Sequence, residues 1–156
     1  MPCLVSVEER QSNFKTEHSI KNFYNYLNFP GNARPAMEFY AKCLGADLQI
    51  MPFSQGPADM PKDPKTADMV LHSRLSKGNA IIMASDCPPG MPLSQGNNFA
   101  ISVDCDSREE VDKLFASLGE KGKIGMPVQD MFWGDYFGMI TDQFGVNWMF
   151  NHTPKK

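Results

Sequence analysis

The chain has 156 residues, of which 42% are hydrophobic, so it can form one domain or two half-domains that share a core. A formal net charge of −3 indicates no surface suited to nucleic acid or to an anionic membrane. No apolar run approaches the roughly 20 residues that span a bilayer, and the N-terminus lacks the pattern of a signal peptide. The four cysteines are scattered without a C-x-x-C pair, so we expect reduced thiols in a cytoplasmic protein.

The first half of the chain predicts a short module after a polar extension. Residues 1–20 are aperiodic and predict the extension, and residues 21–87 predict the module. Within it, Asn32 is the expected N-cap of a helix that ends at Leu44, where Gly45 suits a left-handed stop. The expected strands lie at about 22–29, 46–53, 68–76 and 79–86.

The second half repeats this order. A proline-rich linker at 88–96 precedes the second module at 97–151, and residues 152–156 form a tail. Ser107 and Glu110 fit a capping box at the start of a helix that ends at Leu118. The expected strands lie at about 97–104, 123–131, 135–141 and 146–151.

Apolar residues recur at helical spacing in both predicted helices. They are Ala36, Phe39, Tyr40 and Cys43 in the first and Val111, Leu114, Phe115 and Leu118 in the second. Spacing of i, i+3, i+4 and i+7 places each set on one helical face. The order βαβββ therefore occurs twice and predicts an α+β fold, with a site between the two copies.

Several short motifs resemble one known family, and they do so over residues 22 to 151. They are Phe29-Pro30-Gly31-Asn32, Phe39-Tyr40, Leu44-Gly45, His72, Ser85-Asp86, Phe132-Trp133-Gly134 and Phe144-Gly145-Val146-Asn147-Trp148. Their order resembles the vicinal oxygen chelate superfamily, which includes glyoxalase I, extradiol dioxygenases and bleomycin-resistance proteins. More narrowly, the chain resembles its PhnB-like branch, often labelled 3-demethylubiquinone-9 3-methyltransferase. The resemblance implies two βαβββ modules whose curved mixed sheets form a cup around a small-molecule ligand, often in a homodimer.

The resemblance also implies where a metal would bind. Metal-using members place ligands in the first and last strands of each module, positions that fall near Tyr24, Met83, Asn98 and Met149 in this chain. Divalent cations prefer carboxylate or imidazole ligands, which none of these residues offers. We therefore expect no metal at these positions and predict no other cofactor.

Strand parity predicts which side chains face the cup, because alternate residues of a strand point to opposite faces. Leu27, Phe29, Leu75, Phe99, Ile101, Val103 and Trp148 form the apolar sets expected to pack on the helices. The residues expected to face the cup are Tyr24, Tyr26, Asn28, Val70, His72, Arg74, Asn98, Ser102, Asn147 and Met149.

His72 and Arg74 are the most chemically versatile residues of this set. An imidazole changes charge near neutral pH, so His72 is the candidate catalytic residue, although a structural hydrogen bond is an equal alternative. Arg74 could bind a carboxylate or phosphate, or could be a solvated or ion-paired charge. Asp86 could pair with Arg74, but a structural role such as capping the following loop is favoured.

The segment 131–137 is the densest aromatic stretch. Trp133 and Phe137 could form a stacking wall of an apolar pocket, or could close the core or a dimer interface. The proline-rich loop at 54–66 could be a lid over the cup or an idle surface loop.

Four functions remain open from the sequence. The first is an enzyme, lyase- or isomerase-like or another kind, that acts on a small polar or anionic organic molecule with acid–base help from His72. The second is a non-catalytic protein that binds or sequesters a small molecule, as the bleomycin-resistance relatives do. A methyltransferase is disfavoured because no glycine-rich loop joins a strand to a helix. A structural homodimer without a ligand is the fourth.

Overall fold

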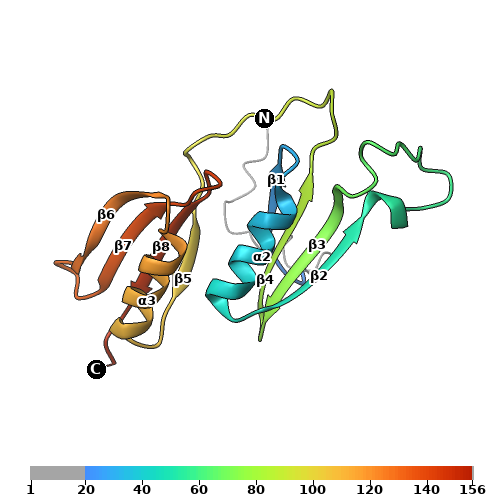
Figure 1. The fold of residues 1–156 in the computed structure, drawn as a ribbon. Helices are drawn as coiled ribbons and strands as arrows, with labels where there is room; N and C mark the ends of the chain where they lie inside the picture. Colours follow the sequence, from blue (N-terminus) through green and yellow to red (C-terminus); the bar gives the residue numbers. More distant parts are fainter. Residues whose placement is uncertain (1–19, 156) are drawn as a thin grey trace, which may run out of the picture.

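The computed structural model describes residues 20–155 and consists of two modules with the same order of elements (Figure 1). The first contains β1 (Asn25–Phe29), α2 (Ala33–Leu44), β2 (Asp47–Pro52), the 3₁₀ turn η1 (Phe53–Gln55), β3 (Val70–Lys77) and β4 (Ala80–Asp86). The second contains β5 (Ile101–Asp104), α3 (Arg108–Leu118), β6 (Lys123–Asp130), β7 (Tyr136–Thr141) and β8 (Asn147–His152). Except for residue 20, the extension predicted at 1–20 lies outside the described residues.

Each module forms one four-stranded mixed sheet. Sheet A has the strand order β1-β4-β3-β2 and sheet B the order β5-β8-β7-β6. The pairs β1–β4 and β5–β8 are parallel, and the other pairs are antiparallel. The predicted α+β fold of two βαβββ modules is therefore confirmed.

Each helix packs on one face of its own sheet through the predicted apolar stripe. The buried helical residues are Ala33, Ala36, Met37 and Tyr40 in α2 and Val111, Leu114 and Leu118 in α3. Phe39, Cys43 and Phe115 are partly buried at the margin of the core. Each sheet thus has a helix-covered face and a second face, which we call the open face. No helix within residues 20–155 is long and apolar enough to cross a membrane.

The two modules share their hydrophobic core. Helices α2 and α3 contact each other, and aromatic rings join α2 to the second module. The ring centroid of Tyr40 lies 5.1 Å from that of Trp148, and the ring centroid of Phe39 lies 5.8 Å from that of Phe144. The modules are therefore packed on one another and not merely linked by residues 88–96.

The start of α2 differs from the prediction. Within the described residues the Asn32 side chain makes no capping hydrogen bond, and its buried Oδ1 has no partner. The cap is instead Asp86, whose Oδ1 accepts hydrogen bonds from the amides of Gly31 (3.1 Å) and Ala33 (2.8 Å). A carboxylate is a stronger acceptor than an amide, and the end of β4 brings it beside the helix. Asp86 therefore has a structural role, as favoured, but it caps the helix rather than the following loop.

The other predicted helix ends are largely confirmed. Ser107 Oγ accepts the amide of Glu110 at 3.2 Å, as in a capping box. The Glu110 carboxylate accepts the amide of Asp106 (3.0 Å), one residue earlier than a full capping box requires. Gly45 has φ of 59° and ends α2 in the left-handed conformation.

Strand β5 is shorter than predicted, and β8 begins and ends one residue later than predicted. Asn98 and Phe99 precede β5, and Phe99 is 58% exposed instead of packing on α3. The Phe99 carbonyl accepts a hydrogen bond from Asn147 Nδ2 (3.1 Å). A side-chain amide thus replaces the backbone amide that a neighbouring strand would supply. At the other end, His152, predicted in the tail, belongs to β8, and its Nδ1 lies 2.9 Å from the carbonyl oxygen of Cys105.

Candidate ligand-binding site

The open face of sheet A contains the histidine and arginine that the sequence singles out. In β3, Ser73 and Leu75 are buried, whereas His72 and Arg74 alternate with them and are partly exposed. Val70, expected on the same face, is fully buried. The pairing of β2 with β3 shifts between Met51 and Pro52, and this irregularity breaks the alternation near Val70.

Tyr26 and His72 lie side by side on this face. Tyr26 alternates with the buried Leu27 in β1 and is 45% exposed, as its parity predicts. Its hydroxyl lies 3.1 Å from Nδ1 of His72, and the two ring centroids are 5.8 Å apart. When the hydroxyl donates to Nδ1, the neutral imidazole carries its proton on Nε2. The pair can then offer that proton to a bound acceptor.

Arg74 completes this cluster from the neighbouring position of β3. The register of sheet A places Tyr26 opposite Met83, and Met83 opposite Arg74. The guanidinium carbon of Arg74 lies 5.8 Å from the ring centroid of Tyr24, within cation–π range. Among the described residues Arg74 has no carboxylate within ion-pair distance. We call Tyr24, Tyr26, His72 and Arg74 the polar cluster.

The predicted residues of the second module lie on sheet B or beside it. Ser102 and Met149 are paired across β5 and β8, on the face opposite the buried Ile101 and Trp148. Phe137 pairs with Asn151 of β8 and also alternates with buried residues. The amide of Asn147 is occupied, because its Oδ1 accepts a hydrogen bond from Thr141 Oγ1 at 2.7 Å.

Three predicted residues lie outside the strands, and one of them, Tyr24, directly precedes β1. Asn98 is in the loop before β5, so strand parity does not define its direction. Trp133 is in the turn between β6 and β7, is 52% exposed, and packs edge-on against Phe132 with ring centroids 4.9 Å apart. The structure does not bring Trp133 into the polar cluster.

The residues at the family's metal positions do not fit a divalent cation. Tyr24 and Met83 belong to module one and Asn98 and Met149 to module two, and they offer a phenol, two thioethers and an amide. Within residues 20–155 no three His, Cys, Asp or Glu side chains are grouped so that they could hold a metal ion. The polar cluster itself contains one imidazole and no carboxylate. Its chemistry is that of hydrogen bonding and positive charge.

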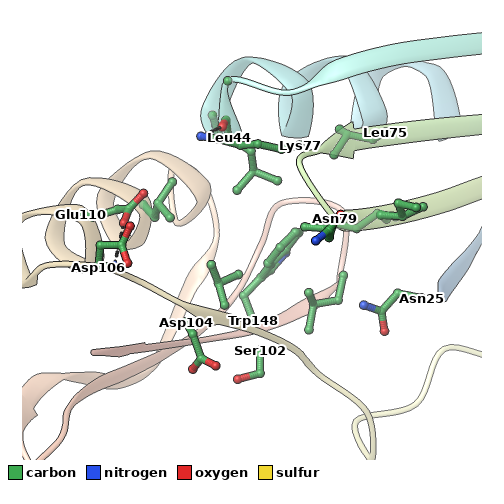
Figure 2. Close-up of a pocket in the computed structure, with 18 of the residues that line it drawn as sticks. Asn25, Leu44, Leu75, Lys77, Asn79, Ser102, Asp104, Asp106, Glu110 and Trp148 are labelled. Carbon is green, nitrogen blue, oxygen red and sulfur yellow. Dashed lines mark hydrogen bonds between the residues drawn. The ribbon is translucent and has the colours of Figure 1, made fainter. Parts of the chain in front are cut away.

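A separate cavity of about 970 Å³ lies between the modules. Leu44, Lys77 and Asn79 of the first module line one side, and Asp104 and Glu110 of the second line another (Figure 2). Tyr24 and Ser102 contribute to it, but His72, Arg74, Tyr26, Asn147 and Met149 are not among its lining residues. The sequence predicts a site between the copies, but it does not identify this cavity. The C-terminal end of α2 and the N-terminal end of α3, which line it, carry no recognisable motif.

The charges around this cavity are of both signs. Lys42, Lys77 and Lys113 lie on its wall together with Asp104, Asp106, Glu109 and Glu110. Lys77 Nζ already donates a 2.6 Å hydrogen bond to the carbonyl of Leu44. The cavity therefore offers no concentrated charge for an anion, unlike the polar cluster.

Comparison with known proteins identifies the family. A family model described as 3-demethylubiquinone-9 3-methyltransferase matches residues 21–150. The chain belongs to this family. It is also 35% identical over 140 residues to Protein YjdN of Escherichia coli (strain K12), a match that covers 81% of this chain and 91% of that protein.

Solved structures related to this 3-demethylubiquinone-9 3-methyltransferase family member show the same fold. Protein PA1353 from Pseudomonas aeruginosa is 38% identical, with a TM-score of 0.76 over 86% of this chain and 98% of that one. A putative 3-demethylubiquinone-9 3-methyltransferase, PhnB protein, from Bacillus cereus is 23% identical, with a TM-score of 0.70 over 85% and 100%. A glyoxalase/bleomycin resistance protein/dioxygenase family enzyme from Burkholderia phytofirmans PsJN is 14% identical, with a TM-score of 0.59 over 84% and 97%. The predicted family, labelled 3-demethylubiquinone-9 3-methyltransferase, is confirmed, and the glyoxalase/bleomycin resistance/dioxygenase relative shares its fold.

Proposed function

We propose that this protein binds a small organic anion on the open face of sheet A. The observation that supports this best is Arg74, a guanidinium with no carboxylate partner among the described residues, beside the Tyr26–His72 pair. A guanidinium offers parallel N–H donors that match a carboxylate or phosphate. Tyr24 stacks against Arg74 and limits the directions that its side chain can take.

The ligand would be held without a metal ion. Arg74 would bind the charged group, and the imidazole Nε2 proton of His72 would supply a second hydrogen bond. The residues at the family's metal positions do not favour a divalent cation, so binding would depend on these organic donors. Asn98, Ser102, Trp133, Phe137, Asn147 and Met149 remain proposed contacts from the second module.

We also propose that a homodimer completes the cup. The open face of sheet A leaves Tyr26 and Met51 each 45% exposed, and Phe132 and Trp133 expose 97% and 52% of their surface. Exposed apolar groups of this size on a small domain favour an interface. The open face of sheet B in a second copy would cover the polar cluster and exclude water from it. A cytoplasmic location also remains a proposal.

A second candidate function is acid–base catalysis on the bound anion. The Tyr26–His72 contact favours it, because a hydroxyl that holds Nδ1 fixes the ring and leaves Nε2 free to exchange a proton with a substrate. Anion binding without catalysis explains the arrangement of Tyr26, His72 and Arg74 equally well. Methyl transfer is not proposed, since the β1–α2 and β5–α3 connections contain no glycine-rich loop of the kind that cradles a nucleotide-like cofactor.

The proposal is tested by measuring anion binding to a variant of the arginine. Calorimetric titration with a panel of organic carboxylates and phosphate esters should yield at least one ligand. Arg74→Gln should weaken its binding about 10-fold or more, because a charge-assisted hydrogen bond is lost. Arg34→Gln on α2 is the matched control and should leave affinity unchanged. Equal affinity for the Arg74→Gln variant and the wild type would contradict the proposal.

A further inference from the structure

The open face of sheet B carries a row of three methionines. Its register pairs Met149 of β8 with Met139 of β7, and Met139 with Met126 of β6. Directly paired residues of antiparallel strands point to the same face. Two strand spacings separate the outer members, so the row is about 10 Å long. All three side chains are partly exposed.

At two of the three equivalent positions, sheet A carries polar residues instead of methionine. In sheet A the equivalent row runs from Tyr26 through Met83 and Arg74 to Gln49. In sheet B it runs from Ser102 through Met149 and Met139 to Met126. Arg74 and Gln49 of one module thus correspond to methionines in the other. One open face is cationic and hydrogen-bonding, and the other is lined by thioethers.

From this asymmetry we propose that the ligand is an amphiphilic anion, with a charged head and an elongated apolar body. The head would bind the polar cluster of sheet A, and the body would lie along Met126, Met139 and Met149. Methionine is apolar, flexible and polarisable, so such a row adapts to an extended chain. This inference rests on the proposed function. One ligand would contact both open faces where the open face of sheet B in a second copy covers the polar cluster of sheet A.

The length of the ligand tests the inference on the full chain. Straight-chain carboxylates such as acetate, hexanoate and decanoate are titrated below the concentrations at which they form micelles. Affinity should rise about three- to fourfold per added methylene, the gain expected when a methylene leaves water for an apolar surface. The decyltrimethylammonium cation, with the same body and the opposite charge, should bind at least 10-fold more weakly than decanoate.

Variants separate the head from the body. Met139→Ser should remove most of the gain from hexanoate to decanoate, Met139→Leu should keep it, and Arg74→Gln should weaken every length by a similar factor. Met91→Ser is the matched control, because Met91 is exposed in the linker between the modules. Circular dichroism establishes folding, and if Met139→Ser does not fold, Met149→Ser and Met126→Ser make the same test.

The outcomes distinguish this inference from the proposed function. Arg74-dependent binding that does not strengthen with chain length would overturn the amphiphilic ligand and leave the anion site standing. A length dependence that persists in all the serine variants, or equal binding of the cation, would overturn it as well. Failure of every anion to bind in an Arg74-dependent manner would overturn both.

Discussion

The hydroxyl of Tyr40 in α2 donates a 2.6 Å hydrogen bond to Oδ2 of Asp142, which lies in the second module. The same oxygen accepts the indole N–H of Trp148 at 2.8 Å, and Oδ1 accepts the amides of Phe144 and Val146. A buried carboxylate with four donors is fully satisfied. It therefore fixes the position of one module relative to the other, although it takes no part in the candidate site.

Replacing Asp142 should destabilise the whole molecule. Asp142→Asn puts an amide nitrogen where one carboxylate oxygen accepts two hydrogen bonds, so buried donors lose their acceptor. We expect a loss of about 3 kcal/mol or more in the free energy of unfolding, measured by urea denaturation. Asp59→Asn, at an exposed loop residue, is the matched control. Loss of less than about 0.5 kcal/mol in Asp142→Asn would show that this contact does not stabilise the module interface.

Tyr40 should make stability depend on alkaline pH. Burial, followed by the charge of Asp142 and its hydrogen bond, raises the pKa of the Tyr40 phenol far above its usual value. Above about pH 10 the unfolded state loses a proton that the folded state keeps, so the free energy of unfolding falls by up to about 1.4 kcal/mol per pH unit. Tyr40→Phe should remove this contribution to the slope. Parallel stability curves for wild type and Tyr40→Phe between about pH 9 and 11 would refute it.

Asp86 should matter for folding and not for ligand binding. Its two oxygens accept the amides of Gly31, Ala33 and Val70. Asp86→Asn should lower the free energy of unfolding by about 1–3 kcal/mol, since one buried amide loses its acceptor. Thermal unfolding followed by circular dichroism measures the change. A stable Asp86→Asn protein that has lost anion binding would instead place Asp86 in the ligand site.

His72 should show the opposite behaviour. Its contact with Tyr26 is exposed to solvent, so His72→Asn should change the free energy of unfolding by less than about 1 kcal/mol. It should still weaken binding of the anion, and if His72 transfers a proton, turnover should fall about 100-fold or more. A large loss of stability with unchanged binding would make the histidine purely structural.

The buried cysteine Cys105 should react slowly with alkylating agents. Burial, with smaller effects from Glu110 and neighbouring acidic residues, raises the pKa of the Cys105 thiol to about 11. At pH 8 about 0.1% of it would be the reactive thiolate. Peptide mapping after iodoacetamide treatment should therefore show modification of Cys105 to increase with pH up to about 11. Complete alkylation of folded protein within minutes at pH 8 would contradict this environment.

Much of the site could be predicted because the strands of the first module alternate clearly. Leu27 and Phe29 mark the buried face of β1, so Tyr26 between them must lie on the other face. In β3, Leu75 marks the buried face, so its neighbour Arg74 must lie on the open face. The rule failed at Val70, where an irregular pairing interrupts the alternation. It also failed at Asn98, because the strand begins four residues later than predicted.

The contacts that join distant segments could not be predicted. Tyr40 and Asp142 are 102 positions apart, and nothing in either local sequence indicates the other. Asn32 has the residue type of an N-cap, but Asp86, 53 positions beyond Ala33, takes this role because the fold brings β4 beside α2. Local patterns define elements and faces, whereas these buried polar contacts depend on how the elements pack.

The most direct test of the anion site is to map a bound ligand by NMR. Full-length, isotopically labelled protein is titrated with hexanoate, and chemical-shift changes are assigned to residues. The account predicts the largest changes at Tyr26, His72 and Arg74 on the open face of sheet A. Changes confined to Lys42, Lys113 and the other residues of the cavity between the modules would contradict it.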